Sequence, residues 1–227
     1  LLKVPPPDSL AAALATTKHQ QFEVVSEFTT TDSFPTRVKF LPPDYKKSFI
    51  SCKTSLNIFD IEKNDSPIHT IQEDGIITAS AYDPIHPDSV AGAVSGGIKL
   101  WDFRSGEATQ KIEEAHDTTV LDVAFNESKP FWICSGGTDG FLRCWDIRIG
   151  QPQCEFRASS HWVTRTVPSV SQDQLILTSG TDSKVRVFNS SQFAFQNEGN
   201  LKDGEIIKSI RHDDSVYCVA LSSYNSF

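Results

Sequence analysis

The sequence repeats itself at an interval of about 43 residues, and this period constrains the fold more than any other feature. Four six-residue segments each end in an aromatic residue followed by Asp or Asn: 55–60 (SLNIFD), 97–102 (GIKLWD), 141–146 (FLRCWD) and 184–189 (KVRVFN). Their aromatic residues lie 42, 44 and 43 positions apart. Within each segment apolar and polar residues alternate, which predicts a strand with one buried face. A period of this length indicates stacked structural repeats.

Three further strand-like segments accompany each aromatic-ended segment. One that is rich in small and apolar residues precedes it, another lies further upstream, and a short mixed segment follows it. The segments rich in small and apolar residues are 89–95, 131–137 and 175–180. The segments further upstream are 36–41, 118–125 and 215–221, and the short mixed segments are 68–73, 108–114 and 152–158. Four antiparallel strands in a unit of about 40–45 residues are typical of a WD-repeat blade. The chain therefore resembles the all-β WD40 β-propellers, and Trp101-Asp102 and Trp145-Asp146 supply the dipeptide that names the repeat.

The repeat predicts how the chain is divided. We expect an N-terminal linker with a short helix at 1–19 and a propeller over 20–227 that begins with a lone strand at 20–28. The expected blades lie approximately at 34–73, 76–114, 115–158 and 160–210, with a partial blade at 211–227. WD40 propellers usually have seven blades and build one of them from both chain ends, which removes open sheet edges. We therefore expect part of a seven-bladed ring whose beginning and end are missing, with an intact five-bladed ring as the alternative.

Composition narrows the classes of partner. A formal net charge of -8 argues against a general binder of nucleic acid or anionic membranes, because either needs a basic face. No apolar run approaches 18 residues, so we expect no direct insertion into a membrane. The cysteines contain no CxxC pair, which favours reduced, buried thiols in an intracellular protein over a zinc site. They are Cys52, Cys134, Cys144, Cys154 and Cys218.

The resemblance to WD repeats implies a hydrogen-bond tetrad inside each blade. In that family the Trp N–H bonds a Ser or Thr, which bonds a His, which bonds the Asp of a tight turn. The third unit carries all four residues at the matching positions: His116, Ser135, Asp139 and Trp145. We expect these side chains to form a buried polar network that fixes the geometry of the blade.

The other three units match the tetrad incompletely. The fourth unit offers His161, Thr178 and Asp182, but Phe188 replaces the Trp and cannot donate a hydrogen bond. The second unit keeps its Trp, but Ala91 replaces the Ser and Ser95 replaces the Asp. In the first unit Lys53 replaces the Asp.

The residue types of Ser135, His116 and Asp139 are also those of a nucleophilic triad. We expect no catalytic role, since a nucleophile must be exposed beside an oxyanion site and this set half-repeats one blade later. The turns at 92–97 and 135–140 are not phosphate loops, because neither leads into a helix or a Lys-Ser/Thr pair. No HExxH or regular calcium loop occurs, so we expect no enzyme and no catalytic, cofactor-binding or metal residues.

The C-terminal part carries a more specific resemblance. The segments 159–169 (SSHWVTRTVPS), 173–189 (DQLILTSGTDSKVRVFN) and 211–223 (RHDDSVYCVALSS) are similar to the last blades of the EARP- and GARP-interacting WD-repeat protein family. That family implies a non-enzymatic scaffold that binds vesicle-tethering complexes in endosomal recycling and endosome-to-Golgi traffic. The resemblance implies tethering-complex subunits as partners. It also implies that the protein is cytoplasmic and that its partners bring it to endosome or trans-Golgi membranes.

Two other functions compete with this one. Arg104 and Arg148 follow their Trp-Asp pairs as WDxR motifs, which occur in substrate receptors of cullin–RING ubiquitin ligases. An Arg at this position can equally pair locally or lie in solvent. The third hypothesis is a peptide receptor that uses the residues just after each blade-opening His. Its candidate surface is Asp117, Thr118, Trp162 and Asp213, in which Trp162 is either an exposed binding residue or packed between blades.

Overall fold

The computed structural model describes residues 27, 30, 34–41, 45–62, 66–170, 175–190 and 206–221. All regular elements in these ranges are β-strands, and all their pairings are antiparallel. The first eight are β1 (Pro35–Leu41), β2 (Lys47–Cys52), β3 (Ser55–Asp60), β4 (His69–Gln72), β5 (Ile77–Tyr82), β6 (Ser89–Val94), β7 (Gly97–Asp102) and β8 (Ala108–Ile112). The others are β9 (Val120–Phe125), β10 (Trp132–Gly137), β11 (Phe141–Asp146), β12 (Gln151–Arg157), β13 (Val163–Pro168), β14 (Leu175–Gly180), β15 (Lys184–Asn189) and β16 (Ile206–Arg211).

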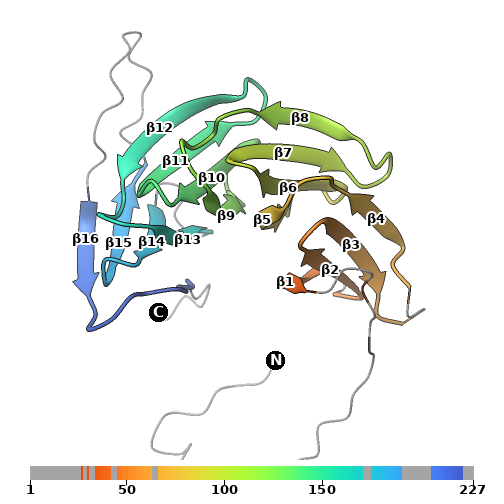
Figure 1. Ribbon diagram of the computed structural model, residues 1–227, viewed down its shortest axis with the longest axis horizontal. Coiled ribbons are helices and arrows are strands. Elements are labelled where there is room, and N and C mark those ends of the chain that lie inside the picture. The colour runs from red at the N-terminus through yellow and green to blue at the C-terminus, as the bar shows by residue number, and fades with distance from the viewer. Residues whose placement is uncertain are drawn as a thin grey trace, which may run out of the picture.

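Each set of four consecutive strands forms one sheet. The strand orders are β1-β2-β3-β4, β5-β6-β7-β8, β9-β10-β11-β12 and β13-β14-β15-β16. The sheets follow one another along an arc, with β1, β5, β9 and β13 on its inner side and β4, β8 and β12 on its outer side (Figure 1). This arrangement confirms the predicted all-β propeller class.

The aromatic-ended segments are the third strands of the sheets, with the predicted bounds. The alternation predicted one buried face, but these strands are buried on both faces. Asn57 in β3 is buried and donates a hydrogen bond of 3.0 Å from Nδ2 to Ser55 Oγ, while its Oδ1 accepts one from Thr70. Arg186 in β15 is also buried. The prediction of one buried face was wrong at these positions, because hydrogen bonds and an ion pair within the same sheet satisfy the buried polar side chains.

A hydrophobic core fills the space between each pair of neighbouring sheets. The core between the first two sheets includes Phe49, Leu56 and Trp101. The core between the second and third includes Ile98 and Ile133. Burying side chains of this size contributes roughly 1.5–3 kcal/mol each, so the contacts between blades hold the arc together. The core between the last two sheets includes Leu142, Phe156 and Phe188.

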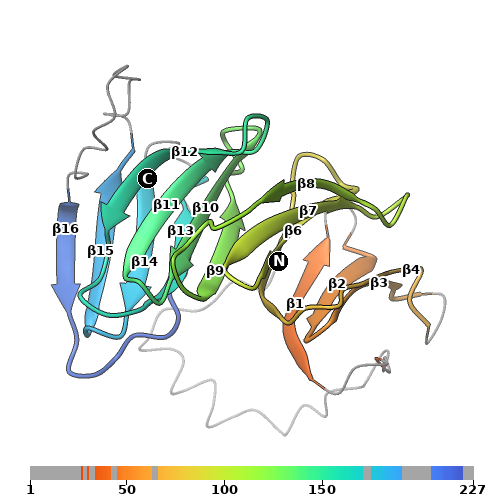
Figure 2. The same cartoon turned by 45° about the horizontal axis from the view of Figure 1, so that its top comes forward.

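The sheets at the two ends of the arc expose apolar side chains. In the first sheet Val38 and Phe40 are 60% and 57% exposed, and in the last sheet Ile207 is 52% exposed. Figure 2 shows these two sheets at opposite ends of the molecule. Interior blades carry no such exposed rows, since their faces lie against neighbours. The seven-bladed ring and the division into blades and linker stay predictions.

The predicted strand at 215–221 is not a strand. The segment lies against the end of the last sheet, where Val216 N–H donates to Gly180 O at 3.1 Å and Thr164 Oγ1 donates to Val216 O at 2.6 Å. The second contact repeats the one from Thr78 Oγ1 to Val120 O, 2.7 Å, at the start of β9. The segment thus begins as an inner strand would. It forms no ladder because the described residues contain no second strand with which it could pair.

Several other expectations concern the chain termini and the thiols. The linker and helix at 1–19 lie outside the described residues, as does nearly all of the strand predicted at 20–28. Among the residues that are described, no helix could cross a bilayer.

Four cysteines are buried, but Cys218 is exposed because its segment joins no sheet. The expectation of a buried thiol was wrong at that position.

Candidate functional site

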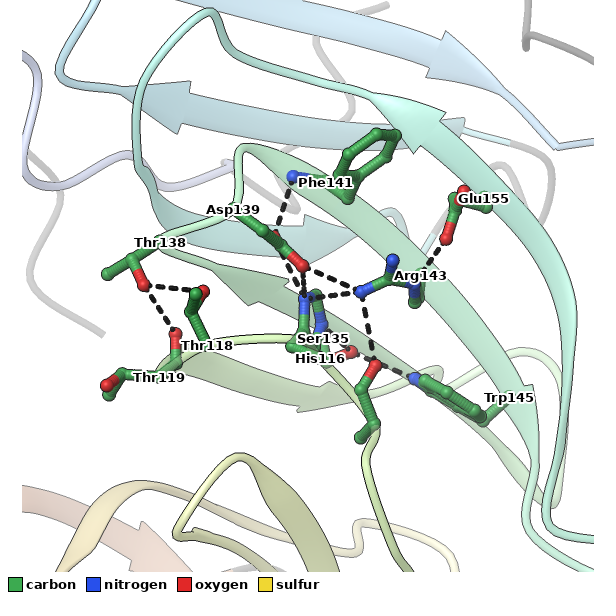
Figure 3. Close-up of polar contacts among 11 residues, drawn as sticks. His116, Thr118, Thr119, Ser135, Thr138, Asp139, Phe141, Arg143, Trp145 and Glu155 are labelled. Carbon is green, nitrogen blue, oxygen red and sulfur yellow. Dashed lines mark hydrogen bonds and ion pairs between the residues drawn. The ribbon is translucent and has the colours of Figure 1, made fainter.

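The four predicted tetrad residues of the third sheet lie together in a chain of hydrogen bonds (Figure 3). Trp145 Nε1–H donates to Ser135 Oγ at 2.9 Å, and Ser135 Oγ lies 2.8 Å from His116 Nε2. His116 Nδ1 lies 2.9 Å from Asp139 Oδ2. Because a carboxylate only accepts, Nδ1 carries the imidazole proton and Nε2 accepts from the Ser135 hydroxyl. The network therefore joins the loop before β9 to β10, β11 and the turn between them.

Arg143 extends this network and was not predicted to belong to it. One guanidinium nitrogen donates to Asp139 Oδ2 at 2.8 Å and to Ala115 O at 3.2 Å, and Nε pairs with Glu155. Burial raises the pKa of Asp139, but hydrogen bonds from His116, the Phe141 N–H and Arg143 outweigh it and lower that pKa to about 2. The Asp-x-x-x-Arg spacing of 139 and 143 was the sequence signal for this pair.

The fourth sheet differs from the predicted partial tetrad. Ser159, not His161, occupies the place that His116 has in the third sheet, four residues before its inner strand, and it is buried. His161 is exposed, and its N–H donates to Ser159 Oγ at 3.1 Å. The prediction for His161 was wrong because the blade opens two residues earlier than the Ser-His dipeptide suggested. Thr178 and Asp182 do lie at the predicted positions, on β14 and in the turn after it.

A buried ion pair stabilises the turn of this sheet in place of the tetrad. Arg186 donates to Asp182 Oδ1 at 3.1 Å and to Oδ2 at 2.6 Å. Burial raises the pKa of Asp182, but the hydrogen bonds of Arg186 and of the Ser160 N–H lower it below its usual value overall. The pair has the same spacing as Asp139 and Arg143.

In the second sheet Trp101 has no hydroxyl partner at the tetrad position. Gly92 pairs with Lys99 as Ser135 pairs with Arg143, so Gly92, not Ala91, is the counterpart of the tetrad serine. A Cβ at Gly92 would meet the Trp101 ring at 2.8 Å. The indole ring thus fills the space that a side chain would need.

The triad-like set of the third sheet is closed to a substrate. Ser135 is 0% exposed, and its hydroxyl is held between Trp145 and His116. The His116 side chain is also fully buried. A nucleophile that attacks a substrate needs access to it and an oxyanion site, so this geometry supports a structural network. Within the described ranges, no cluster of three or more His, Cys, Asp or Glu side chains could hold a metal ion.

The candidate partner residues gather at one end of the sheets. Asp117, Thr118, Trp162 and Asp213 are all exposed and lie beside the turns between second and third strands. Thr118 Oγ1 accepts a bond of 2.7 Å from Thr138, and Trp162 N–H donates to Thr181 at 3.2 Å. In the part of the chain that the structure describes, the Trp162 side chain is 52% exposed. We call this end the turn face.

The turn face also contains an open pocket of about 700 Å³. The loop after β4, the turn after β6 and the loop before β9 line it. Two of the candidate residues, Asp117 and Thr118, belong to its lining. Sequence reasoning had no signal for the pocket, because it forms between two blades.

Comparison with known proteins identifies the family to which the chain belongs. The EIPR1 β-propeller family matches residues 59–188, which is more than half of the chain. The chain belongs to the EIPR1 β-propeller family. The match confirms the propeller fold and the family resemblance, and it covers the C-terminal segments 159–169 and 173–188 but not 211–223.

Relatives of this EIPR1-family chain carry names that state what they bind. EARP and GARP complex-interacting protein 1 of Homo sapiens is 31% identical over 170 residues, covering 64% of this chain and 44% of the relative. EARP-interacting protein 1 of Caenorhabditis elegans is 30% identical over 171 residues, covering 67% and 47%. The EARP-interacting protein homolog of Gekko japonicus is 31% identical over 170 residues, covering 64% and 44%. The matches thus span less than half the length of these relatives.

The two WDxR arginines of the EIPR1-family chain lie at the opposite end of the sheets from the turn face. Arg104 N–H and guanidinium donate to Asp102 at 2.8 and 3.1 Å. Arg148 N–H and Nε donate to Asp146 at 3.0 and 2.9 Å. Each exposed guanidinium therefore pairs with the Asp of its own Trp-Asp dipeptide. This geometry agrees with local pairing, which is the alternative to a role in docking on a ubiquitin ligase.

Proposed function

We propose that this chain is part of a non-catalytic adaptor that binds EARP- and GARP-type vesicle-tethering complexes. The observation that carries the proposal is the chain's membership of the EIPR1 β-propeller family, together with the names of its relatives. The adaptor would act in endosomal recycling and endosome-to-Golgi traffic. It would work in the cytoplasm and reach endosome and trans-Golgi membranes through its partners.

The architecture suits a binding platform. Four sheets packed through continuous cores form a rigid scaffold, and rigid elements position a binding surface without large ordering costs. The turn face supplies exposed polar and aromatic side chains, of which Trp162 is the largest. The buried hydroxyl of Ser135 leaves the one triad-like set without access to substrate. These features support protein binding over catalysis.

Affinity purification tests the proposal. The protein would be tagged in its native cell at its natural level, and co-purifying proteins would be quantified by mass spectrometry against the tag alone. We expect subunits of tethering complexes to be enriched. Enrichment of a cullin–RING adaptor without any tethering subunit would contradict the proposal and favour the ligase alternative. A parallel purification of the variant Arg104→Ala/Arg148→Ala separates these outcomes, because only ligase docking would need both guanidinium groups.

A further inference from the structure

The pocket on the turn face carries negative charge, and no positively charged Lys or Arg in its lining neutralises it. Glu114 and Asp117 line it, and no Lys or Arg does. Both carboxylates are exposed, and neither forms a salt bridge with any residue that the structure describes. The neighbouring Glu113, by contrast, pairs with Lys111 at 2.6 Å. The pocket therefore offers two unpaired negative charges to a ligand.

The rest of the lining combines hydroxyl groups with apolar surface. Ser95 and Thr118 add hydroxyl groups, and Thr118 Oγ1 accepts from Thr138 and retains its own proton to donate. Ile76 lines the same pocket and is 52% exposed. A Lys or Arg side chain has a matching character, because it carries an apolar stem and a cationic head with several donors.

We propose that this pocket binds a lysine or arginine side chain presented by an exposed segment of a protein partner. The stem would lie along Ile76, and the cationic head would reach Glu114 and Asp117. A protein is favoured over a free small cation because the pocket opens on the same face as Trp162, which offers a second, aromatic contact to a longer ligand. The inference rests on the proposed adaptor function and names the chemistry by which the adaptor holds its partner.

The first experiment measures partner binding by charge-neutralised variants. The full chain as it occurs in the cell would be titrated with purified EARP complex at low and high salt. We expect Glu114→Gln/Asp117→Asn to weaken binding about tenfold at low salt, chiefly through slower association, and the difference to shrink as salt screens the charges. The control is Glu107→Gln/Glu127→Gln, which removes the same charge from exposed residues at the other end of the sheets. Equal losses of binding affinity in the two double variants would refute the proposed role of the pocket.

A second measurement keeps the pocket testable if the tethering complex does not bind at all. In that case the proposed function fails, and the pocket is probed directly by amide chemical shifts. The probes are two nine-residue peptides of Ala and Gly with either one central Lys or one central norleucine. We expect the Lys peptide to shift the amides of Ser95, Glu114 and Thr118, and to lose this effect in Glu114→Gln/Asp117→Asn. No shift, or an equal shift with norleucine, would refute the site. Binding of spermidine at least as strong as that of the Lys peptide would refute a protein ligand.

Discussion

Trp145 Nε1 lies 2.9 Å from Ser135 Oγ, and both side chains are buried between the third sheet and its neighbours. In the fourth sheet the corresponding residues are Phe188 and Thr178, which lack this hydrogen bond donor. One blade is thus held by a polar network and the next by apolar packing and an ion pair. The third sheet should therefore be the more sensitive of the two to loss of a polar group.

The first prediction compares the two histidines that the repeat pattern equated. His116→Ala removes one hydrogen bond from Ser135, which keeps Trp145 as a partner, and one from Asp139, which keeps Arg143. Loss of these bonds in a buried network should lower the free energy of unfolding by about 1–3 kcal/mol. His161→Ala changes an exposed ring and should alter stability by less than about 0.5 kcal/mol. Urea denaturation of both variants measures the difference. Similar losses in both would contradict the assignment of Ser159 to the tetrad position.

The second prediction concerns Asp122, which lies on β9 facing Arg37 on β1 and Arg165 on β13. Its Oδ2 also accepts from Thr166 N–H at 2.8 Å. Burial raises the pKa of Asp122 to about 6 against the lowering effect of Arg37 and Thr166. The folded protein therefore binds the proton more tightly than the unfolded chain does. The stability contributed by this group is present at low pH and is lost as pH rises from about 4 through about 6.

Unfolding free energies measured between pH 4 and 7 test this linkage. A shift of this size corresponds to a loss on the order of 3 kcal/mol across the window. Asp122→Asn removes the titrating group, so its stability should depend less steeply on pH than that of the natural protein, whatever its absolute stability. If the two slopes coincide, Asp122 does not carry the linkage.

The period of the sequence was enough to predict the propeller class and the third strand of every sheet. Four strands were not predicted, because their mixed residues gave no comparable signal: β2, β5, β13 and β16. The register of the tetrad was predictable where Trp145 and His116 both occur. It failed at His161 because Ser159 performs the equivalent contact without being a histidine.

The candidate site could be predicted only in part. Asp117 and Trp162 were expected near a binding face because they follow the blade openings, and both are exposed. The pocket with Glu114 and Ile76 could not be predicted, since it forms where loops of two blades meet. Glu114 also has a left-handed backbone, with φ of 53°, which no sequence pattern indicated.

The third prediction concerns the thiols. Cys134, Cys144 and Cys154 lie side by side across three strands of one blade, and Cys134 and Cys144 have their Sγ atoms 3.4 Å apart. Hydrogen bonding within this row and burial raise the pKa of Cys144, which keeps it an unreactive thiol. Cys218 alone among the five is exposed. A thiol reagent at neutral pH should label one cysteine per chain rapidly and the others only after denaturation, and Cys218→Ser should abolish the rapid phase.

The fourth prediction separates stability from docking at the WDxR motifs. Arg104 and Arg148 are largely exposed and pair with Asp102 and Asp146 two residues away. Exposed ion pairs contribute little to stability, so Arg104→Ala/Arg148→Ala should leave the melting temperature close to that of the natural protein. Binding to tethering complexes should also be unchanged, since the arginines lie away from the turn face. A selective loss of tether binding would place the partner at the wrong end of the sheets for our proposal.

The last prediction concerns Trp162, which is 52% exposed on the turn face. Trp162→Ala removes a large, amphipathic contact surface without opening a cavity in a core, so we expect the melting temperature to change little. Partner binding should weaken by at least about tenfold if Trp162 is one of the few residues that dominate the interface energy. The control is Tyr45→Ala, which truncates an aromatic side chain of 62% exposure at the other end of the first sheet. Thermal melting and titration with the tethering complex would be measured on both variants. A large drop in melting temperature for Trp162→Ala would instead show that the indole supports the blade, and equal binding losses in both variants would show that the turn face has no special part in recognition.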